Sequence, residues 1–256
     1  GQRIADEIRD ALENFAGYTA VNEDDVEDTI DQYDLDEEAM SPIEWRQLAG
    51  QMNASLVMLG TATAGAGGVV VDVDFLDPRT GDQLPMEPVT VADDRSHEEA
   101  AQQIMQQLET GVEYGRRIAF CSEYLSTESW GDAISNCNEA LSLSPGSTRA
   151  LYLRGRAHMG MNEYGSAVDD LETVVSEEPS NTEALQSLAY THAQLGNADR
   201  SLELYREYLN FNPDDVDVRL NVAYNLATAG GYAEAMQILD DGIERDPENV
   251  ALLEYQ

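Results

Sequence analysis

The chain of 256 residues contains no lysine: all 14 of its basic residues are arginine, against 50 aspartate and glutamate residues. The formal net charge is −36 at pH 7, and the acidic residues are spread along the chain rather than gathered in a tail. Nucleic acids and anionic lipids are bound through basic patches that neutralise phosphates. The composition therefore excludes binding of either through such a patch.

The excess of acidic residues also indicates the salt concentration at which the fold is stable. Like charges at this density raise the energy of the compact state. At about 1 M salt the Debye length falls to about 3 Å, and most of this repulsion is screened. The surface is typical of a protein from a halophile, and we expect molar salt to stabilise the fold. A specific cationic partner is the alternative explanation.

Other absences exclude further classes of function. No apolar run is long enough for a membrane span. No glycine loop has the lysine and helix of a phosphate-binding loop, and no serine or cysteine has the setting of a nucleophile. The three histidines are scattered, and the acidic clusters lack the spacing of a calcium loop. The sequence therefore predicts no metal, no cofactor and no enzymatic activity.

What the chain does contain is a 34-residue period in its C-terminal half. Similar contexts surround prolines at this spacing, namely Pro145, Pro179, Pro213 and Pro247. Small residues recur at the same step, namely Ala133, Ala167, Ser201 and Ala235, and also Gly155, Ala189 and Ala223. Such a period predicts a repeat architecture. Two amphipathic helices per unit give repeats at 114–147, 148–181, 182–215 and 216–249, and a fifth begins at 250.

This unit resembles the tetratricopeptide repeat family, whose repeat is a 34-residue helix–turn–helix. The resemblance covers 114–256 and implies an all-α superhelix with a concave groove that binds extended or helical peptide segments. Asn138, Arg154 and Cys121 depart from the family pattern, since the family usually has apolar or small residues there.

In that family the groove is lined mainly by the first helix of each repeat. The matching positions here, our candidate partner-binding residues, are Arg149, Tyr152, Arg156, Gln186, Tyr190, Gln194, Asn221 and Tyr224. Tyrosine offers flat contact area, amides can pair with a peptide backbone, and two arginines can clamp a carboxylate. The alternative is that these are merely solvated residues. The lysines of chaperone-binding members are missing, so chaperone binding is not predicted.

The two cysteines form no metal motif. Cys121 and Cys137 lie on the two predicted helices of the first repeat, which the hairpin brings together. A disulfide is therefore conceivable if the compartment is oxidising. Both can equally be small buried thiols, so the sequence leaves this choice open.

The first 113 residues predict a small α/β domain, which makes the whole chain α+β. Helices are expected at 3–16, 22–33, 41–52 and 96–114, the third opening with a capping box at Ser41 and Glu44. Strands are expected at 18–21, 54–63, 69–77 and 83–92, in a three- or four-stranded mostly antiparallel sheet. Pro85 and Pro88 indicate an edge strand or a bulge.

This order of elements resembles the amino-terminal domain of TolB and the related CsgG- and FlgO-type envelope domains. The matching positions are Ala54, Val57 and Gly60 in a strand, and Asp77, Thr80 and Gly81 in a hairpin turn. The apolar first strand of those families is missing here, and we expect it to lie upstream of Gly1. Its absence would leave one sheet edge open.

Together these features predict a non-enzymatic scaffold that binds a partner segment in the repeat groove. The resemblance implies assembly in the cell envelope, with the protein periplasmic or lipid-anchored. One alternative is an architectural module that self-associates through the open sheet edge or the terminal repeat. Another is a regulatory module of a larger signalling protein, in the cytoplasm.

Overall fold

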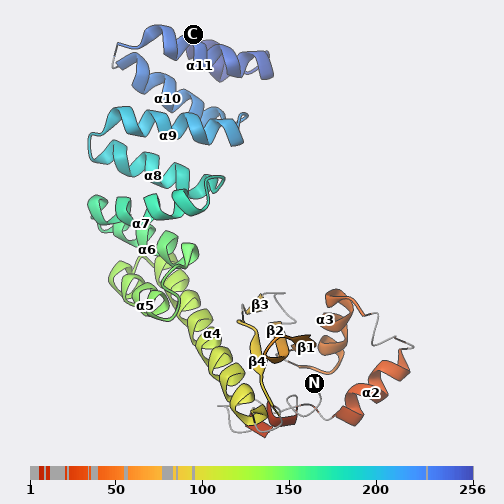
Figure 1. Cartoon of the computed structure of the whole chain (residues 1–256). Helices are drawn as coiled ribbons and strands as arrows, with labels where there is room; N and C mark the ends of the chain where they lie inside the picture. The colour runs from red at the N-terminus through yellow and green to blue at the C-terminus, as the bar shows by residue number, and fades with distance from the viewer. Residues whose placement is uncertain are drawn as a thin grey trace. The chain divides into compact units, whose positions relative to one another are not determined.

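The computed structural model describes residues 6–8, 10–11, 21, 23–33, 35, 40–54, 57–76, 83–84, 86–93, 96–228 and 230–255. The chain divides into two compact units, Gly1–Glu113 and Tyr114–Gln256 (Figure 1). The first combines helices with a small antiparallel sheet, and the second is a helical array in its described residues. The predicted α+β fold class is confirmed.

The first unit contains the short helices α2 (Glu23–Gln32) and α3 (Pro42–Gln51) before its sheet. The predicted capping box opens α3: the backbone N–H of Ser41 donates to Glu44 Oε2 at 2.7 Å, and that of Glu44 donates to Ser41 Oγ at 3.4 Å. The backbone N–H and the hydroxyl of Ser41 both donate to the Glu44 carboxylate and lower its pKa. The box therefore fixes the start of α3.

Two of the predicted elements fall mainly outside the described residues. Of the helix expected at 3–16, positions 6–8 and 10–11 are described, and they are helical. Of the strand expected at 18–21, only Val21 is described. The Asp77, Thr80 and Gly81 turn lies outside the described residues altogether.

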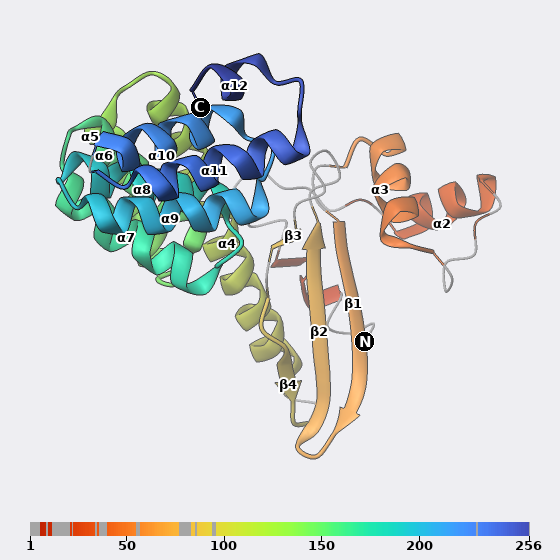
Figure 2. The same ribbon diagram turned by 90° about the horizontal axis from the view of Figure 1, so that it is seen from above.

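A long hairpin forms the centre of the sheet, made of β1 (Val57–Gly65) and β2 (Gly68–Leu76). The two strands pair antiparallel along their whole length, from Val57 opposite Leu76 to Gly65 opposite Gly68 (Figure 2). Gly68 has φ +140°, and a Cβ there would lie 2.1 Å from the carbonyl oxygen of Val91. Only glycine fits at the end of this turn.

The other edge of β2 carries two short segments in place of the single strand expected at 83–92. They are β3 (Gln83–Leu84), opposite residues 75–76, and β4 (Val89–Val91), opposite residues 69–71. The step from Leu84 to Val89 is one residue longer than the facing step from Val71 to Phe75. Among the described strands β3 and β4 pair only with β2, so they lie at an edge of the sheet, which is one of the two alternatives that the prolines predicted.

The core of the first unit lies on one face of β2. Val71, Val73 and Phe75 point inward, whereas Asp72 and Asp74 are exposed, as the alternating pattern predicts. These valines and the phenylalanine cluster with Ile8, Val89 and Val91, and with Ala101, Ile104 and Leu108 of the next helix. Helix and sheet are therefore held by one apolar cluster.

That next helix, α4, runs from His97 to Ser126 without a break. The sequence predicted a helix ending near Tyr114, and this boundary was wrong. No proline interrupts the stretch, and a Cβ at Gly115 would meet nothing within 4 Å, so this glycine marks no turn. The first repeat therefore takes the C-terminal part of α4 as its first helix.

The remaining helices follow the 34-residue step (Figure 1). They are α5 (Trp130–Leu143), α6 (Thr148–Gly160), α7 (Tyr164–Glu177), α8 (Thr182–Gln194), α9 (Ala198–Phe211), α10 (Val216–Thr228), α11 (Tyr232–Arg245) and α12 (Val250–Tyr255). First helices begin at 148, 182, 216 and 250, and second helices at 130, 164, 198 and 232. Four hairpins and the start of a fifth are therefore in strict register.

A capping residue explains why each first helix begins where it does. In every case its side-chain oxygen accepts from the backbone N–H three residues later, at 3.0 to 3.3 Å; the caps are Ser147, Asn181, Asp215 and Asn249. They follow the repeated prolines by two residues. The sequence prediction used the prolines and missed these caps, although their polar identity was a readable signal.

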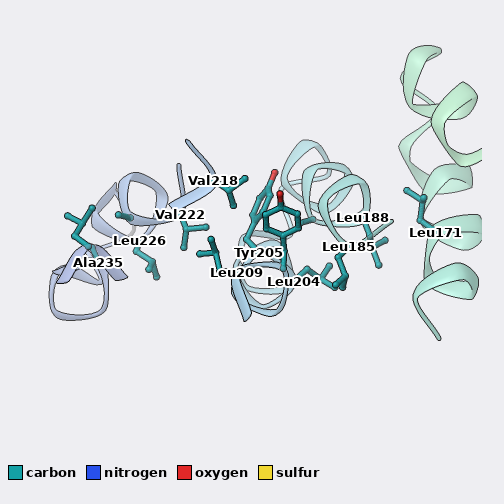
Figure 3. Close-up of a cluster of buried hydrophobic side chains, with 14 of the residues drawn as sticks. Leu171, Leu185, Leu188, Leu204, Tyr205, Leu209, Val218, Val222, Leu226 and Ala235 are labelled. Atoms are coloured by element: carbon teal, nitrogen blue, oxygen red, sulfur yellow. The ribbon is translucent and has the colours of Figure 1, made fainter. Parts of the chain in front are cut away.

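The repeats are held by a continuous apolar core. Leu185 and Leu188 of α8 and Leu204 of α9 are fully buried and cluster with Val222 of α10 (Figure 3). The small residues repeated in the sequence are buried where the two helices of a hairpin approach each other, as at Ala133 and Ala167. This packing is what a stack of helical hairpins requires.

Candidate protein-interaction face

The eight candidate partner-binding residues all lie on first helices. Helix α6 carries Arg149, Tyr152 and Arg156, helix α8 carries Gln186, Tyr190 and Gln194, and helix α10 carries Asn221 and Tyr224. All are exposed except Tyr152, which is half-buried. Arg156, Tyr190 and Tyr224 occupy the same position in consecutive repeats, and the two tyrosines are 43% and 58% exposed. We call these eight residues the first-helix face.

Tyr152 connects α6 to α8. Its ring packs against the buried cluster that contains Ala184 of α8, and the guanidinium carbon of Arg156 lies 5.9 Å from the centre of that ring. Burial raises the pKa of Tyr152, and the nearby Arg156 charge opposes this rise. The ring is therefore fixed in place and holds a cation beside it.

The two arginines of the first-helix face have no carboxylate partner. Within the described residues no ion pair involves Arg149 or Arg156, although the chain has 50 acidic residues. Other described arginines do pair: Arg117 with Glu139, Arg154 with Asp170, Arg200 with Glu203 and Arg206 with Glu234. Helix α6 therefore presents two cations that the described part of the chain leaves unneutralised.

Tyr190 sits among other tyrosines. Burial raises the pKa of Tyr205 on α9, and the adjacent Tyr190 adds to the rise. Burial and Tyr190 likewise raise the pKa of Tyr164 at the start of α7. The sequence prediction did not bring these three rings together, because they lie on three helices of two repeats.

The amides of the first-helix face differ in how they are used. The Asn225 side chain donates to Asn221 Oδ1 at 2.7 Å and to the Asn221 carbonyl at 2.9 Å. This occupies the oxygen of the Asn221 amide and leaves its N–H groups without a partner among the described residues. Gln186 and Gln194 are exposed, and their side chains make no hydrogen bond within the described part of the chain.

Two histidines in equivalent repeat positions have structural contacts. His158 Nδ1 lies 2.7 Å from Glu163 Oε2, and His192 Nδ1 lies 3.3 Å from Asn197 Nδ2. Burial lowers the pKa of His192, whose Nε2 is buried without a hydrogen bond. Among the residues that the structure describes, no group of three or more acidic, histidine or cysteine side chains could hold a metal ion.

Cys121 and Cys137 are joined by a disulfide. The sulfurs are 2.07 Å apart, the Cα atoms 5.5 Å apart, and both residues are fully buried. The bond connects α4 to α5, the two helices of the first repeat.

The polar departures from the repeat pattern form one network. Arg154 Nε and Nη2 donate to Asp170 at 2.9 and 2.6 Å, and Nη1 donates to Asn138 Oδ1 at 2.6 Å. The hydrogen bonds that Arg154 donates to Asp170 raise the pKa of Arg154. The network joins α5, α6 and α7, and so accounts for two of the residues that seemed out of place in the sequence.

Comparison with known proteins supports the reading of this array. Models of the tetratricopeptide repeat match residues 152–216 and 192–254. These repeats are tetratricopeptide repeats. Such repeats are generally modules for protein–protein interaction rather than enzymes.

Solved structures share the tetratricopeptide fold at low sequence identity. A crystal structure of MamA is 17% identical with a TM-score of 0.50, and the match covers 60% of this chain and 91% of MamA. A tetratricopeptide repeat protein from Parabacteroides merdae ATCC 43184 is 17% identical with a TM-score of 0.51, over 56% of this chain and 57% of that protein. No curated protein sequence matches the chain. None of the described helices is both long and apolar enough to cross a bilayer.

Proposed function

We propose that the tetratricopeptide repeats bind an extended or helical segment of a partner protein along the first-helix face. The observation that carries this proposal is the pair Arg149 and Arg156. Both are exposed and neither has a carboxylate partner among the described residues, in a chain where acids outnumber arginines 50 to 14. A carboxylate on the partner would satisfy them.

The rest of the first-helix face suits the same role. Tyr190 and Tyr224 are exposed and offer ring surface at small entropic cost. Gln186, Gln194 and Asn221 carry amides that pair with a peptide backbone. The arginines give the segment its register, and the tyrosines and amides supply contact along it.

The test is the double variant Arg149→Ala with Arg156→Ala, used as bait in extracts of the source organism at molar potassium chloride. We expect capture of the partner to be lost and the melting temperature to be unchanged, since both side chains are exposed. The matched control is Arg117→Ala with Arg200→Ala, which removes two arginines that pair with carboxylates of the chain. Equal capture by the double variant and the wild type would remove this face as the binding site.

We also propose that the protein works in the cell envelope. The Cys121–Cys137 disulfide supports this location, because disulfides persist in oxidising compartments and are rare in the cytosol. So does the resemblance of the first unit to TolB-type domains. Trapping of free thiols in intact cells, followed by denaturation and mass measurement, tests it. Two reduced cysteines would favour the alternative of a cytoplasmic signalling module.

Self-association is the second candidate. Among the described strands β1 pairs only with β2, so its nine residues have one edge without a strand partner. Such an edge can pair with a second chain. Light scattering over a range of protein concentrations at molar salt would detect an oligomer. A constant monomer mass would exclude this architectural role.

The acidic surface is, we propose, an adaptation to high salt. Screening at about 1 M removes most of the repulsion among the charges. The melting temperature should therefore rise steeply between low and molar potassium chloride. A flat profile would contradict this reading.

A further inference from the structure

A second site lies away from the first-helix face. A cavity of about 800 Å³ opens between α9, α10 and α11 in the third and fourth repeats. Its polar lining includes Arg206, Asn210, Arg219, Gln237, Asp241 and Arg245. This volume is in the range of small-molecule sites. The lining gathers three of the 14 arginines of a chain whose net charge is −36.

Arg219 forms the buried wall of this cavity. The residue is only 4% exposed, and its guanidinium donates to two backbone carbonyls, those of Ile238 at 2.7 Å and Pro213 at 2.6 Å. Within the described residues no carboxylate forms an ion pair with it. Burial lowers its pKa; the Asp241 charge opposes this effect, and the Arg245 charge adds to it. The guanidinium fork keeps further N–H donors that neither carbonyl uses.

The repeat positions show that the fold does not need an arginine here. The residues equivalent to Arg219 are Leu151 and Leu185, both buried. The residue equivalent to Gly242 is Tyr208 in the third repeat. A Cβ at position 242 would lie 2.5 Å from Cδ of Arg219, so only glycine leaves room for this side chain. Leu185 and Tyr208 of the third repeat thus correspond to Arg219 and Gly242 of the fourth repeat. The glycine leaves the space that the arginine side chain occupies.

The mouth of the cavity carries unpaired charges of both signs. Arg245, Asp241 and Glu244 are exposed, and none of them forms an ion pair within the described part of the chain. Arg206 differs, because it pairs with Glu234 at 2.8 Å. A simple anion would be repelled by the two carboxylates, and a simple cation by the two guanidinium groups.

We propose that this cavity binds a small zwitterion, of which an α-amino acid is the simplest. Its carboxylate accepts hydrogen bonds from Arg219 and Arg245, as guanidinium forks favour. Its ammonium group donates to Asp241 or Glu244. The site does not depend on the first-helix face, and the two can be occupied together.

The ligand class is tested by titration calorimetry of the full chain at molar potassium chloride with glycine, glutamate and lysine. Acetate and methylammonium serve as the two halves of the zwitterion. We expect at least one amino acid to bind, and both halves to bind at least about tenfold more weakly, since each lacks one charge-assisted contact. Binding by none of the three amino acids overturns the proposal, as does equally tight binding of acetate or methylammonium.

The site is tested by two variants. Arg219→Leu introduces the residue found at 151 and 185, and Arg245→Gln changes an exposed side chain that the fold does not use. Each should weaken amino-acid binding by about tenfold or more. Arg200→Gln, outside the cavity, should leave it unchanged. If Arg245→Gln binds the amino acid as tightly as the wild type, the proposal is overturned, whatever the result for Arg219→Leu. Partner capture by the first-helix face is a separate measurement, and neither result affects it.

Discussion

The first repeat and the later repeats differ in the residue pair that joins their two helices at one equivalent position. In the first, Cys121 and Cys137 are covalently joined. The equivalent pairs, at steps of 34 residues, are Gly155 with Leu171, Ala189 with Tyr205, and Ala223 with Leu239. A Cβ at Gly155 would lie 3.0 Å from Leu171 Cγ, so the second repeat is closely packed here. What recurs is a small residue on the first helix, and its partner on the second helix varies.

A second set of positions shows the same freedom. The second repeat places the Arg154–Asp170 ion pair where the third has Leu188 and Leu204. The fourth has Val222 and Ile238 there. The helix caps and small residues thus fix the hairpin, and large core positions accept a disulfide, an ion pair or aliphatic side chains. Four predictions test this comparison.

The largest effect is expected from the disulfide. Its cysteines are 16 residues apart in sequence, and closing a loop of this length stabilises a fold by about 3 kcal/mol. Cys121→Ala with Cys137→Ala should lower the free energy of unfolding by about this amount, measured in guanidinium at molar salt. Reductant should have the same effect on the wild type and none on the variant. A variant as stable as the oxidised wild type would show that alanine packing serves equally well here.

The next effect concerns the ion pair of the second repeat. Arg154→Ala leaves the Asp170 carboxylate, whose side chain is only 7% exposed, without its partner. We expect a loss of about 2 kcal/mol, less than for a fully buried pair because Arg154 is partly solvated. Denaturant unfolding at pH 7 measures it.

The double change Arg154→Leu with Asp170→Leu is the control, because it copies the third repeat. Replacing a buried ion pair by apolar residues is often neutral or stabilising. A stability equal to or above that of the wild type would show that the two repeats are interchangeable at this position. A loss as large as that of Arg154→Ala would show that the polar network with Asn138 is required.

A smaller effect is expected at the helix caps, which the repeats share. Asn181 Oδ1 accepts from the backbone N–H of Ala184 at 3.0 Å. Asn181→Ala should cost about 1 kcal/mol. Ser180→Ala, one residue earlier and exposed, should cost almost nothing. If both variants unfold alike, the cap does not fix the start of α8.

The smallest effect is a pH dependence. Burial lowers the pKa of His192 in the folded state below its ordinary value of about 6.5. The contribution of neutral His192 to the free energy of unfolding is complete above about pH 6.5. It is lost as the pH falls toward the pKa of the folded state, because the unfolded chain takes up the proton first. His192→Leu, which copies Leu226 of the fourth repeat, should remove this loss. The free energy of unfolding is measured against pH for the wild type and for His192→Leu. The effect of the carboxylates is common to both proteins and cancels in the difference. A difference that stays constant with pH would contradict the prediction.

The period predicted the repeat half of the fold closely, because prolines and small residues act locally. Every helix from α5 onward begins on the 34-residue step. The continuous α4 was missed because the start of the first repeat, at residue 114, was taken as the end of a helix, although no proline interrupts the sequence there. The capping box of α3 was predicted, because it depends on adjacent residues.

The candidate sites divide in the same way. The exposed positions of the first-helix face followed from the period and the family pattern. The lack of a carboxylate partner for Arg149 and Arg156 among the described residues could not be predicted from the period, because it depends on where acidic residues far away in the sequence lie in the fold. The Arg219 cavity was missed for the same reason: the substitution of leucine by arginine is visible in the sequence, but its meaning depends on Gly242, 23 positions later.

The unbroken spacing of the helix starts makes the length of this protein adjustable. No insertion separates one hairpin from the next, so residues 182–215 form a unit that begins and ends on equivalent positions. A duplicated copy would join its neighbours through surfaces that they already present to each other. Duplication in the gene could therefore extend the binding surface in steps of one hairpin without redesign of any junction.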